Sequence, residues 1–366
     1  MSDQQNHIER LRKEISELET SLSWYRDTFE NRRVAGIVKD RFFRAKKKFN
    51  KAEGLEGRIA DYINNNPVTV RSANKLHSVS IIMLSFNRVE DTRKAVKSIY
   101  KNTTVPFELI ILDNDSNEDV RAELKQFTEK YKDLRVILET TNLGCAKGRV
   151  KASRFAKYDH LLFLDNDIIV SPYYVENLFS LLYSQENVAG VCCKVVFPNG
   201  KIQFNGGQMI EDDGYALYSL HDEGLEFDEP ATNRFNDCQW IPGGATIWKR
   251  SVFEKFGIDE EMKGSFEDNE ICYRIRAAGY LLLNSPASIV IHDHFDFKNT
   301  IFKKNEAKYY AGRNDQGRIL DALLHFYNKH HLIFSFAWKN NPWDMIWNLH
   351  SREEVLRFIR ENNHKL

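Results

Sequence analysis

The chain has 366 residues, and its 52 basic and 52 acidic side chains cancel to a net charge of zero, so nothing in the overall charge indicates a nucleic-acid partner. An aromatic content of 12% argues against disorder. The five cysteines lack the C-x-x-C spacing of a zinc site and indicate buried thiols in a reducing compartment, which predicts a cytoplasmic protein.

Residues 1–30 predict a helix that pairs with a second copy of itself. Apolar residues recur at alternating steps of three and four from Ile8 to Phe29. This is the a/d pattern of a coiled coil, so we expect a homo-oligomer formed through this helix. The alternative is a helix that packs against its own domain.

A basic segment and a linker are expected over residues 31–77. Residues 32–51 contain nine basic side chains and one acid, with apolar residues between them. Such a helix can lie on an anionic membrane surface, or it can present a solvated face while a few residues pack inward. No apolar run approaches the roughly 18 residues that a membrane span needs. Gly54, Gly57 and the run 64–67 then predict a linker.

Alternating strands and helices predict an α/β domain over residues 78–298. Apolar runs predict strands over 79–84, 107–112, 134–138 and 160–164, with helices over 90–100, 117–127 and 145–156. Near-continuous apolar strands are typical of a mostly parallel sheet with helices on both faces, a Rossmann-like arrangement. The glycine-rich motifs of Walker ATPases and of dinucleotide-binding folds are absent.

The second half of the chain is more mixed. Residues 211–237 are acidic and predict a mobile loop, whereas 267–278 predict a helix followed by strands. Residues 299–366 predict a helical C-terminal region, in which Ser351 and Glu354 form a capping box.

Acidic residues follow two of the predicted strands. Asp165 and Asp167 come directly after the strand 160–164, and Asp113 and Asn114 follow the strand 107–112. Open α/β sheets bind ligands at the carboxyl ends of their strands. Carboxylates are the ligands that Mg²⁺ and Mn²⁺ prefer, commonly together with substrate phosphates. A metal-bridged diphosphate site is therefore the functional interpretation, and ordinary Asx turns are the structural one.

Four further positions carry candidate chemistry. Glu267 and Asp268 lie at a helix start, where one of them could be a general base, or both could simply complement the helix dipole. Glu270 and Arg274 have the spacing of a surface ion pair. His292 follows a strand and could bind metal or be an ordinary polar residue. The glycine pair at 243–244 allows the backbone to approach a ligand closely, or forms a bend.

Seven short motifs occur in order between residues 78 and 294. They are S-F-N at 85–87, L-D-N-D-S at 112–116, N-L-G at 142–144, D-N-D at 165–167, W-I-P-G-G at 240–244, E-D-N-E through Arg274 at 267–274, and a strand that ends at His292. In this order and spacing they resemble glycosyltransferase family 2, an inverting family with the GT-A fold and a D-x-D motif.

The resemblance implies a nucleoside pocket, a divalent metal (Mn²⁺ or Mg²⁺) and a catalytic base. The nucleotide would contact Ser85, Asn87, Asp113, Asn114 and Asp165. Asp167 and His292 would bind the metal, with Asp165 as an alternative ligand, and Asp268 would be the base. The donor sugar and the acceptor would contact Trp240, Gly243, Gly244 and Glu267.

The implied reaction transfers a sugar from a nucleotide-diphosphate donor, with a UDP-sugar favoured, to a hydroxyl of a glycan, lipid-linked or protein acceptor in bacterial surface-polysaccharide assembly. Position 115 departs from the family pattern because it is acidic, and Lys147 and Arg149 add cations that could hold phosphate or lie on the surface. Two alternatives remain, namely a sugar nucleotidyltransferase and a non-catalytic dimeric scaffold with this fold.

Overall fold

The computed structural model describes residues 54–65, 77–262, 265–293, 315–337 and 341–363. The chain divides into two compact units, Met1–Glu53 and Gly54–Leu366, and all described residues belong to the second. The expected coiled coil over 1–30 and the basic segment over 32–51 lie outside the described residues, so both stay predictions.

The described residues contain a ten-stranded sheet with the core order β10-β12-β6-β11-β4-β1-β2-β3. The first half is parallel and consists of β1 (Val79–Ser85), β2 (Phe107–Asp113), β3 (Leu134–Leu138) and β4 (His160–Asp165). β1 and β2 are buried along nearly their whole length, as their near-continuous apolar sequences predict. The predicted α/β class and the first four strands are confirmed.

The second half of the sheet is mixed, because β11 (Ala245–Lys249) runs antiparallel between β4 and β6 (Val188–Val196). β12 (Leu281–His292) lies parallel to β6 and also pairs antiparallel with β5 (Ile168–Val170) and β10 (Asp237–Cys238). The short β7 (Ile202–Phe204) pairs antiparallel with β6. These reversals bring β12 next to the chain that leaves β4.

Helices pack on this sheet where the alternating pattern places them. α3 (Val89–Asn102) packs against β5, α4 (Glu118–Lys130) against β3, α5 (Gly144–Ser153) against β1, and α6 (Tyr174–Leu182) against β12 and β6. α7 (Arg250–Phe256) and α8 (Glu267–Ala277) follow β11 in the chain and pack against each other.

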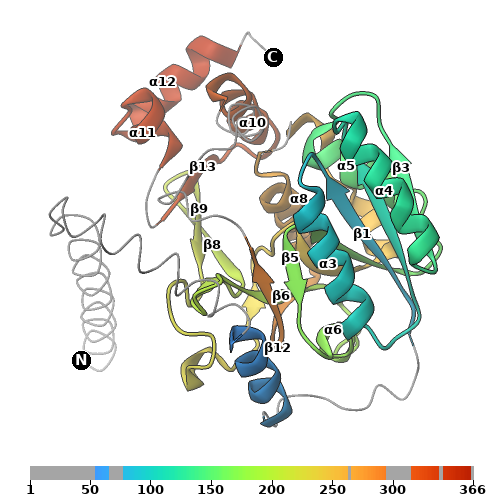
Figure 1. The fold of residues 1–366 in the computed structure, drawn as a ribbon. Helices are drawn as coiled ribbons and strands as arrows, with labels where there is room; N and C mark the ends of the chain where they lie inside the picture. Colours follow the sequence, from blue (N-terminus) through green and yellow to red (C-terminus); the bar gives the residue numbers. More distant parts are fainter. Residues whose placement is uncertain (1–53, 66–76, 263–264, 294–314, 338–340, 364–366) are drawn as a thin grey trace, which may run out of the picture. The chain divides into compact units, whose positions relative to one another are not determined.

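The predicted linker at Gly54 and Gly57 is wrong, because residues 54–65 are helical. Leu55, Ile59 and Ile63 are buried in a small apolar cluster that includes residues of β6, β7 and β12. This helix, blue in Figure 1, therefore packs on the sheet. Its apolar residues recur every four positions, and this helical spacing outweighs the two glycines.

The predicted loop over 211–237 is also wrong for its first part. β8 (Gly207–Asp212) and β9 (Tyr215–Leu220) form an antiparallel hairpin. The two residues of its turn, Asp213 and Gly214, both have positive φ, at 44° and 79°. Asp-Gly at such a position is a strong hairpin signal, since type I′ turns need positive φ at both central residues.

The C-terminal region is helical as predicted, with α10 (Gln316–His330), α11 (Pro342–Trp347) and α12 (Arg352–Asn362). The capping box of α12 is confirmed: the Ser351 hydroxyl and the Glu354 carboxylate each bind the other's backbone N–H. One strand was not predicted: β13 (Ile333–Phe336) lies parallel to β9 and completes a three-stranded sheet (Figure 1). Within the described ranges, no helix has the length and apolar character to cross a bilayer.

Candidate active site

The carboxyl ends of three adjacent parallel strands bring the predicted acids to one edge of the sheet. Ser85 at the end of β1 is in register with Asp113 at the end of β2. On the other side of β1, Leu84 is in register with Asp165 at the end of β4. This arrangement follows from the strand order β4-β1-β2, which places the two loops after β2 and β4 on either side of the loop after β1.

Asp113 is fully buried and only partly satisfied. Its Oδ2 lies 3.2 Å from Arg121 Nε and accepts a hydrogen bond from the Ser116 N–H. Its Oδ1 has no hydrogen-bond partner within the part of the chain that the structure describes. Burial raises the pKa of this carboxyl group. An unsatisfied buried acceptor is unfavourable unless a ligand donor reaches it.

The two asparagines predicted to contact the nucleotide also hold the surrounding loops together. Asn87 Oδ1 accepts a hydrogen bond of 2.8 Å from the Asn117 N–H. Asn114 Oδ1 accepts one of 2.7 Å from the Leu143 N–H, and its amide donates to the Gly144 carbonyl. The loops after β1 and β2 and the start of α5 are thereby fixed against one another. The nucleotide contacts of both side chains stay predictions.

Asp167 and His292 lie side by side at the same edge. β5 pairs with β12 so that Ile168 is opposite His292. Asp167 Oδ1 is 3.1 Å from His292 Nε2, and Asp167 Oδ2 is 2.8 Å from Arg88 Nη1. Arg88 is a residue that sequence reasoning missed, although it directly follows the S-F-N motif.

This pair suits a divalent cation. The Nδ1–H of His292 donates to Gln203 Oε1 at 2.8 Å, and Nε2 and Asp167 Oδ1, which lie 3.1 Å apart, are the two atoms that would bind the ion. Metal-ligating histidines are commonly oriented by such a hydrogen bond from the ring nitrogen that does not bind the metal. The described residues contain no cluster of three or more His, Cys, Asp or Glu side chains that could hold a metal. Mg²⁺ and Mn²⁺ sites with one or two protein ligands are completed by substrate phosphates and water.

Arg149 joins the end of β4 to the start of α8. This buried guanidinium lies 3.0 Å from Asp165 Oδ1 and 3.2 Å from Glu267 Oε1, so the alternative of a surface cation is excluded for Arg149. Burial acts to lower the pKa of Arg149, but the neighbouring anionic groups, Asp165 first, outweigh this effect and raise it. A Cβ on Gly243 would lie 2.4 Å from Arg149 Nη1, and one on Gly244 would lie 2.0 Å from Asp165 Oδ2. The glycine pair is thus required by close approach to these side chains.

Asp268 adjoins this cluster. Its Oδ2 accepts a hydrogen bond of 3.3 Å from the Gly243 N–H, and its Oδ1 accepts one of 2.9 Å from the Asn269 N–H. Burial, and then the charge of Glu267, raise the pKa of Asp268 to about 6, although Arg149 and the two N–H groups act against this rise. A carboxylate with a pKa near the working pH is well suited to general base catalysis.

Trp240 lies in the aromatic core beneath this edge. It is 8% exposed, its ring packs edge-on against Phe204 and Tyr218, and its indole N–H donates to the Ser219 carbonyl at 3.3 Å. A Cβ on Gly207 would lie 1.9 Å from the indole nitrogen. The ring is therefore part of the apolar core, and a direct sugar contact stays a prediction.

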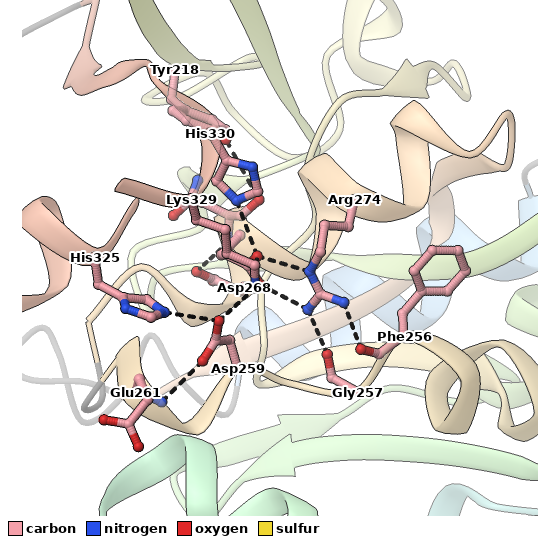
Figure 2. A network of polar contacts seen from close by, with 12 residues as sticks. Tyr218, Phe256, Gly257, Asp259, Glu261, Asp268, Arg274, His325, Lys329 and His330 are labelled. Carbon is pink, nitrogen blue, oxygen red and sulfur yellow. Dashed lines mark hydrogen bonds and ion pairs between the residues drawn. The ribbon is translucent and has the colours of Figure 1, made fainter. Parts of the chain in front are cut away.

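The expectation that Glu270 and Arg274 form a surface pair is wrong, because Glu270 has 0% exposure. The two side chains do pair, with Arg274 donating to both carboxylate oxygens at 2.8 and 2.7 Å. Lys329 and His330 of α10 bind the same carboxylate (Figure 2). These cations hold the pKa of Glu270 far below its usual range. The i,i+4 spacing cannot reveal that another helix covers the pair.

Comparison with known proteins gives a consistent assignment. Residues 80–257 match the family model "Glycosyl transferase family 2". The O-antigen biosynthesis protein RfbC of Myxococcus xanthus is 28% identical over 227 residues, which cover 58% of this chain and 17% of that protein. The hyaluronan synthase of Pasteurella multocida is 29% identical over 258 residues, covering 64% of this chain and 26% of the synthase. The chain thus spans about a quarter or less of these two relatives.

The fold is shared with a solved structure of GalNAc-T7 with UDP, GalNAc and Mn²⁺. The TM-score is 0.53 at 18% sequence identity, and the alignment covers 80% of this chain and 55% of that chain. The predicted GT-A architecture is thereby confirmed. Residues 80–257 thus form a domain that is similar to glycosyltransferase family 2.

Proposed function

We propose that this protein is a metal-dependent, inverting glycosyltransferase that transfers a sugar from a nucleotide-diphosphate donor to an acceptor hydroxyl. One observation carries the proposal: Arg149 bridges Asp165 and Glu267. The bridge links the D-x-D strand end to the start of α8, and this supports one site that combines Asp165 with Asp268.

The chemistry of these groups supports the reaction. A divalent cation held by Asp167 and His292 would neutralise the charge that develops on the departing diphosphate. The Arg88 guanidinium, bound to Asp167, adds positive charge at the same place. Asp268, with a pKa of about 6, is ionised at neutral pH and can accept the proton of the acceptor hydroxyl. A base in this position contributes roughly 10²–10⁴-fold to the rate. Attack opposite the leaving diphosphate inverts the anomeric centre.

We favour a UDP-sugar with Mn²⁺ or Mg²⁺, and a bacterial cell-surface glycan as acceptor. The solved GT-A structure with UDP and Mn²⁺ supports the first part. The second is supported by similarity to O-antigen and hyaluronan proteins, and to an Escherichia coli UDP-glucose glucosyltransferase that acts on a diphosphoundecaprenol-linked sugar. Cys192, Cys193, Cys238 and Cys272 are buried thiols, which supports a reducing, cytoplasmic compartment.

A donor panel tests the proposal. The full chain is incubated with UDP-, GDP- and dTDP-sugars and Mn²⁺, and release of the nucleoside diphosphate is measured with and without candidate acceptors. We expect turnover with a UDP-sugar that EDTA abolishes and that Asp167→Ala and Asp268→Asn each lower at least 100-fold. Asp119→Asn, an exposed acid on α4, is the matched control. Near-normal turnover of either site variant would show that its assigned role is wrong.

A further inference from the structure

The helix that carries Asp268 is held by a buried charge network. Glu270 lies two residues after Asp268 and is fully buried. Arg274, one turn later, binds both of its oxygens, and also donates at 2.5 Å to the Phe256 carbonyl and at 2.7 Å to the Gly257 carbonyl. α8 is thereby tied to the end of α7.

α10 supplies the other cations of the network. Lys329 Nζ lies 2.8 Å from Glu270 Oε1, and the His330 Nε2–H donates to the same oxygen at 3.1 Å. Lys329 also pairs with Asp259 at 2.5 Å, and His325 pairs with Asp259 at 3.0 Å (Figure 2). α10 therefore binds α8 and the loop that leads into it. A charged group that is buried with several hydrogen-bonding partners stabilises one arrangement and strongly disfavours others.

β13 holds the start of α8 from a second side. Phe266, the residue before Glu267, has a φ of 62°, which is uncommon for a bulky side chain and persists only where the surroundings enforce it. Its ring packs on Phe334 of β13 with the centroids 4.3 Å apart. Tyr218 of β9 also stacks on Phe334 and donates a long hydrogen bond to the Asn269 carbonyl.

We propose that α10 and β13 position the catalytic base: Lys329 and His330 hold Glu270, Phe334 holds Phe266, and Asp268 lies between these two anchors against Gly243. The proposal rests on the proposed function, which makes Asp268 the base. It assigns a role in catalysis to a segment that lies beyond the residues matched by the family model, which end at 257. Lys329, His330 and Phe334 are positioning residues, because they act through α8.

The test compares Lys329→Met/His330→Gln with the wild type. Calorimetric titration with UDP and Mn²⁺ counts the folded sites and gives the UDP affinity. Turnover per UDP-binding site is then measured with the UDP-sugar from the donor panel, and hydrogen exchange follows the amides of α8 and β2. Lys329→Arg, which keeps the charge, and Lys125→Met, an exposed lysine on α4, are the controls.

We expect turnover per site to fall about tenfold to a hundredfold, the size of effect that a small misplacement of a reacting group produces. The UDP affinity should stay within about twofold, because Asp113, Asp167 and His292 lie outside the network. Exchange at residues 269–271 should speed up about tenfold or more while β2 stays protected. If the double variant does not fold, Lys329→Met alone leaves Arg274 and His330 on Glu270 and should show the same pattern with smaller changes.

The other possible results refute either this inference or the proposed function. Unchanged turnover and unchanged α8 exchange would overturn the inference, and so would a parallel loss of UDP binding, which indicates general unfolding. If Asp268→Asn retains turnover, the proposed function fails, whereas the exchange measurement still reports on the anchoring of α8. If Asp268→Asn is inactive while the double variant is fully active, only the positioning role is refuted.

Discussion

Replacing Asp268 by Asn should stabilise the protein while it abolishes transfer. Burial and the charge of Glu267 raise the pKa of Asp268 from its ordinary value of 3.8 to about 6. The folded state therefore binds this proton more tightly than the unfolded state does. Above pH 6 the carboxyl is ionised in both states, and the folded state loses about 3 kcal/mol, since each pKa unit corresponds to 1.36 kcal/mol.

The increase in the free energy of unfolding caused by Asp268→Asn should be larger at high pH than at low pH. The variant lacks the ionisable group, so its free energy of unfolding should exceed that of the wild type by about 3 kcal/mol at pH 7.5. As the pH falls through 6, the wild-type carboxyl takes up its proton in the folded state, and the difference should shrink to about 1 kcal/mol at pH 4.5.

Urea denaturation, monitored by circular dichroism, measures the free energy of unfolding at both pH values. Asp119→Asn is the control for a general charge effect. The slope of the unfolding free energy against urea should be the same for each variant, so that midpoints can be compared. A stabilisation that is equal at both pH values, or none at pH 7.5, would refute a raised pKa at Asp268.

Other predictions concern the pH profile, Arg149 and the glycine pair. Wild-type turnover should fall about tenfold for each pH unit below about 6, because only ionised Asp268 accepts the proton; a rate that is flat down to pH 4.5 would contradict this role. Arg149→Met removes a cation that lowers the pKa of Asp268, so the acidic limb of the profile should move to higher pH, and Arg149→Lys should move it less. Gly244→Ala should lower the free energy of unfolding by about 1–3 kcal/mol, because its methyl group would lie 2.0 Å from Asp165 Oδ2. Gly57→Ala, which meets no atom within 4 Å, is the matched control, and an equal effect of both would exclude the clash.

The positions of Asp113 and Asp165 could be predicted from sequence because they depend on which short segments form strands. Apolar runs place β1, β2 and β4, and parallel strands bring Asp113 and Asp165 to one edge whatever the rest of the chain does. The His292–Asp167 contact was predicted only through the family resemblance. It depends on β5 pairing with β12, and strands separated by more than 100 residues leave no local pattern of their pairing.

The other residues of the site are buried by segments that are distant in the sequence. Arg149 is predictable as a cation on a helix, but its close contact with Gly243 involves a turn that is distant in the sequence. Glu270 has the same sequence spacing to Arg274 whether α10 covers it or not. The β8–β9 hairpin differs from these cases, because Asp213-Gly214 is a local signal that the acidic composition of the segment obscured.

The pairing of β13 with β9 has a consequence for biosynthesis. The strand partner of the hairpin is made more than a hundred residues after it, so a growing chain on the ribosome carries β9 with an unpaired edge and with Tyr218 uncovered. Unpaired edges and exposed aromatic surface favour aggregation and chaperone binding. We therefore expect this half of the enzyme to mature only after residue 336 has left the exit tunnel, and stalled chains that end before β13 to be recovered with chaperones.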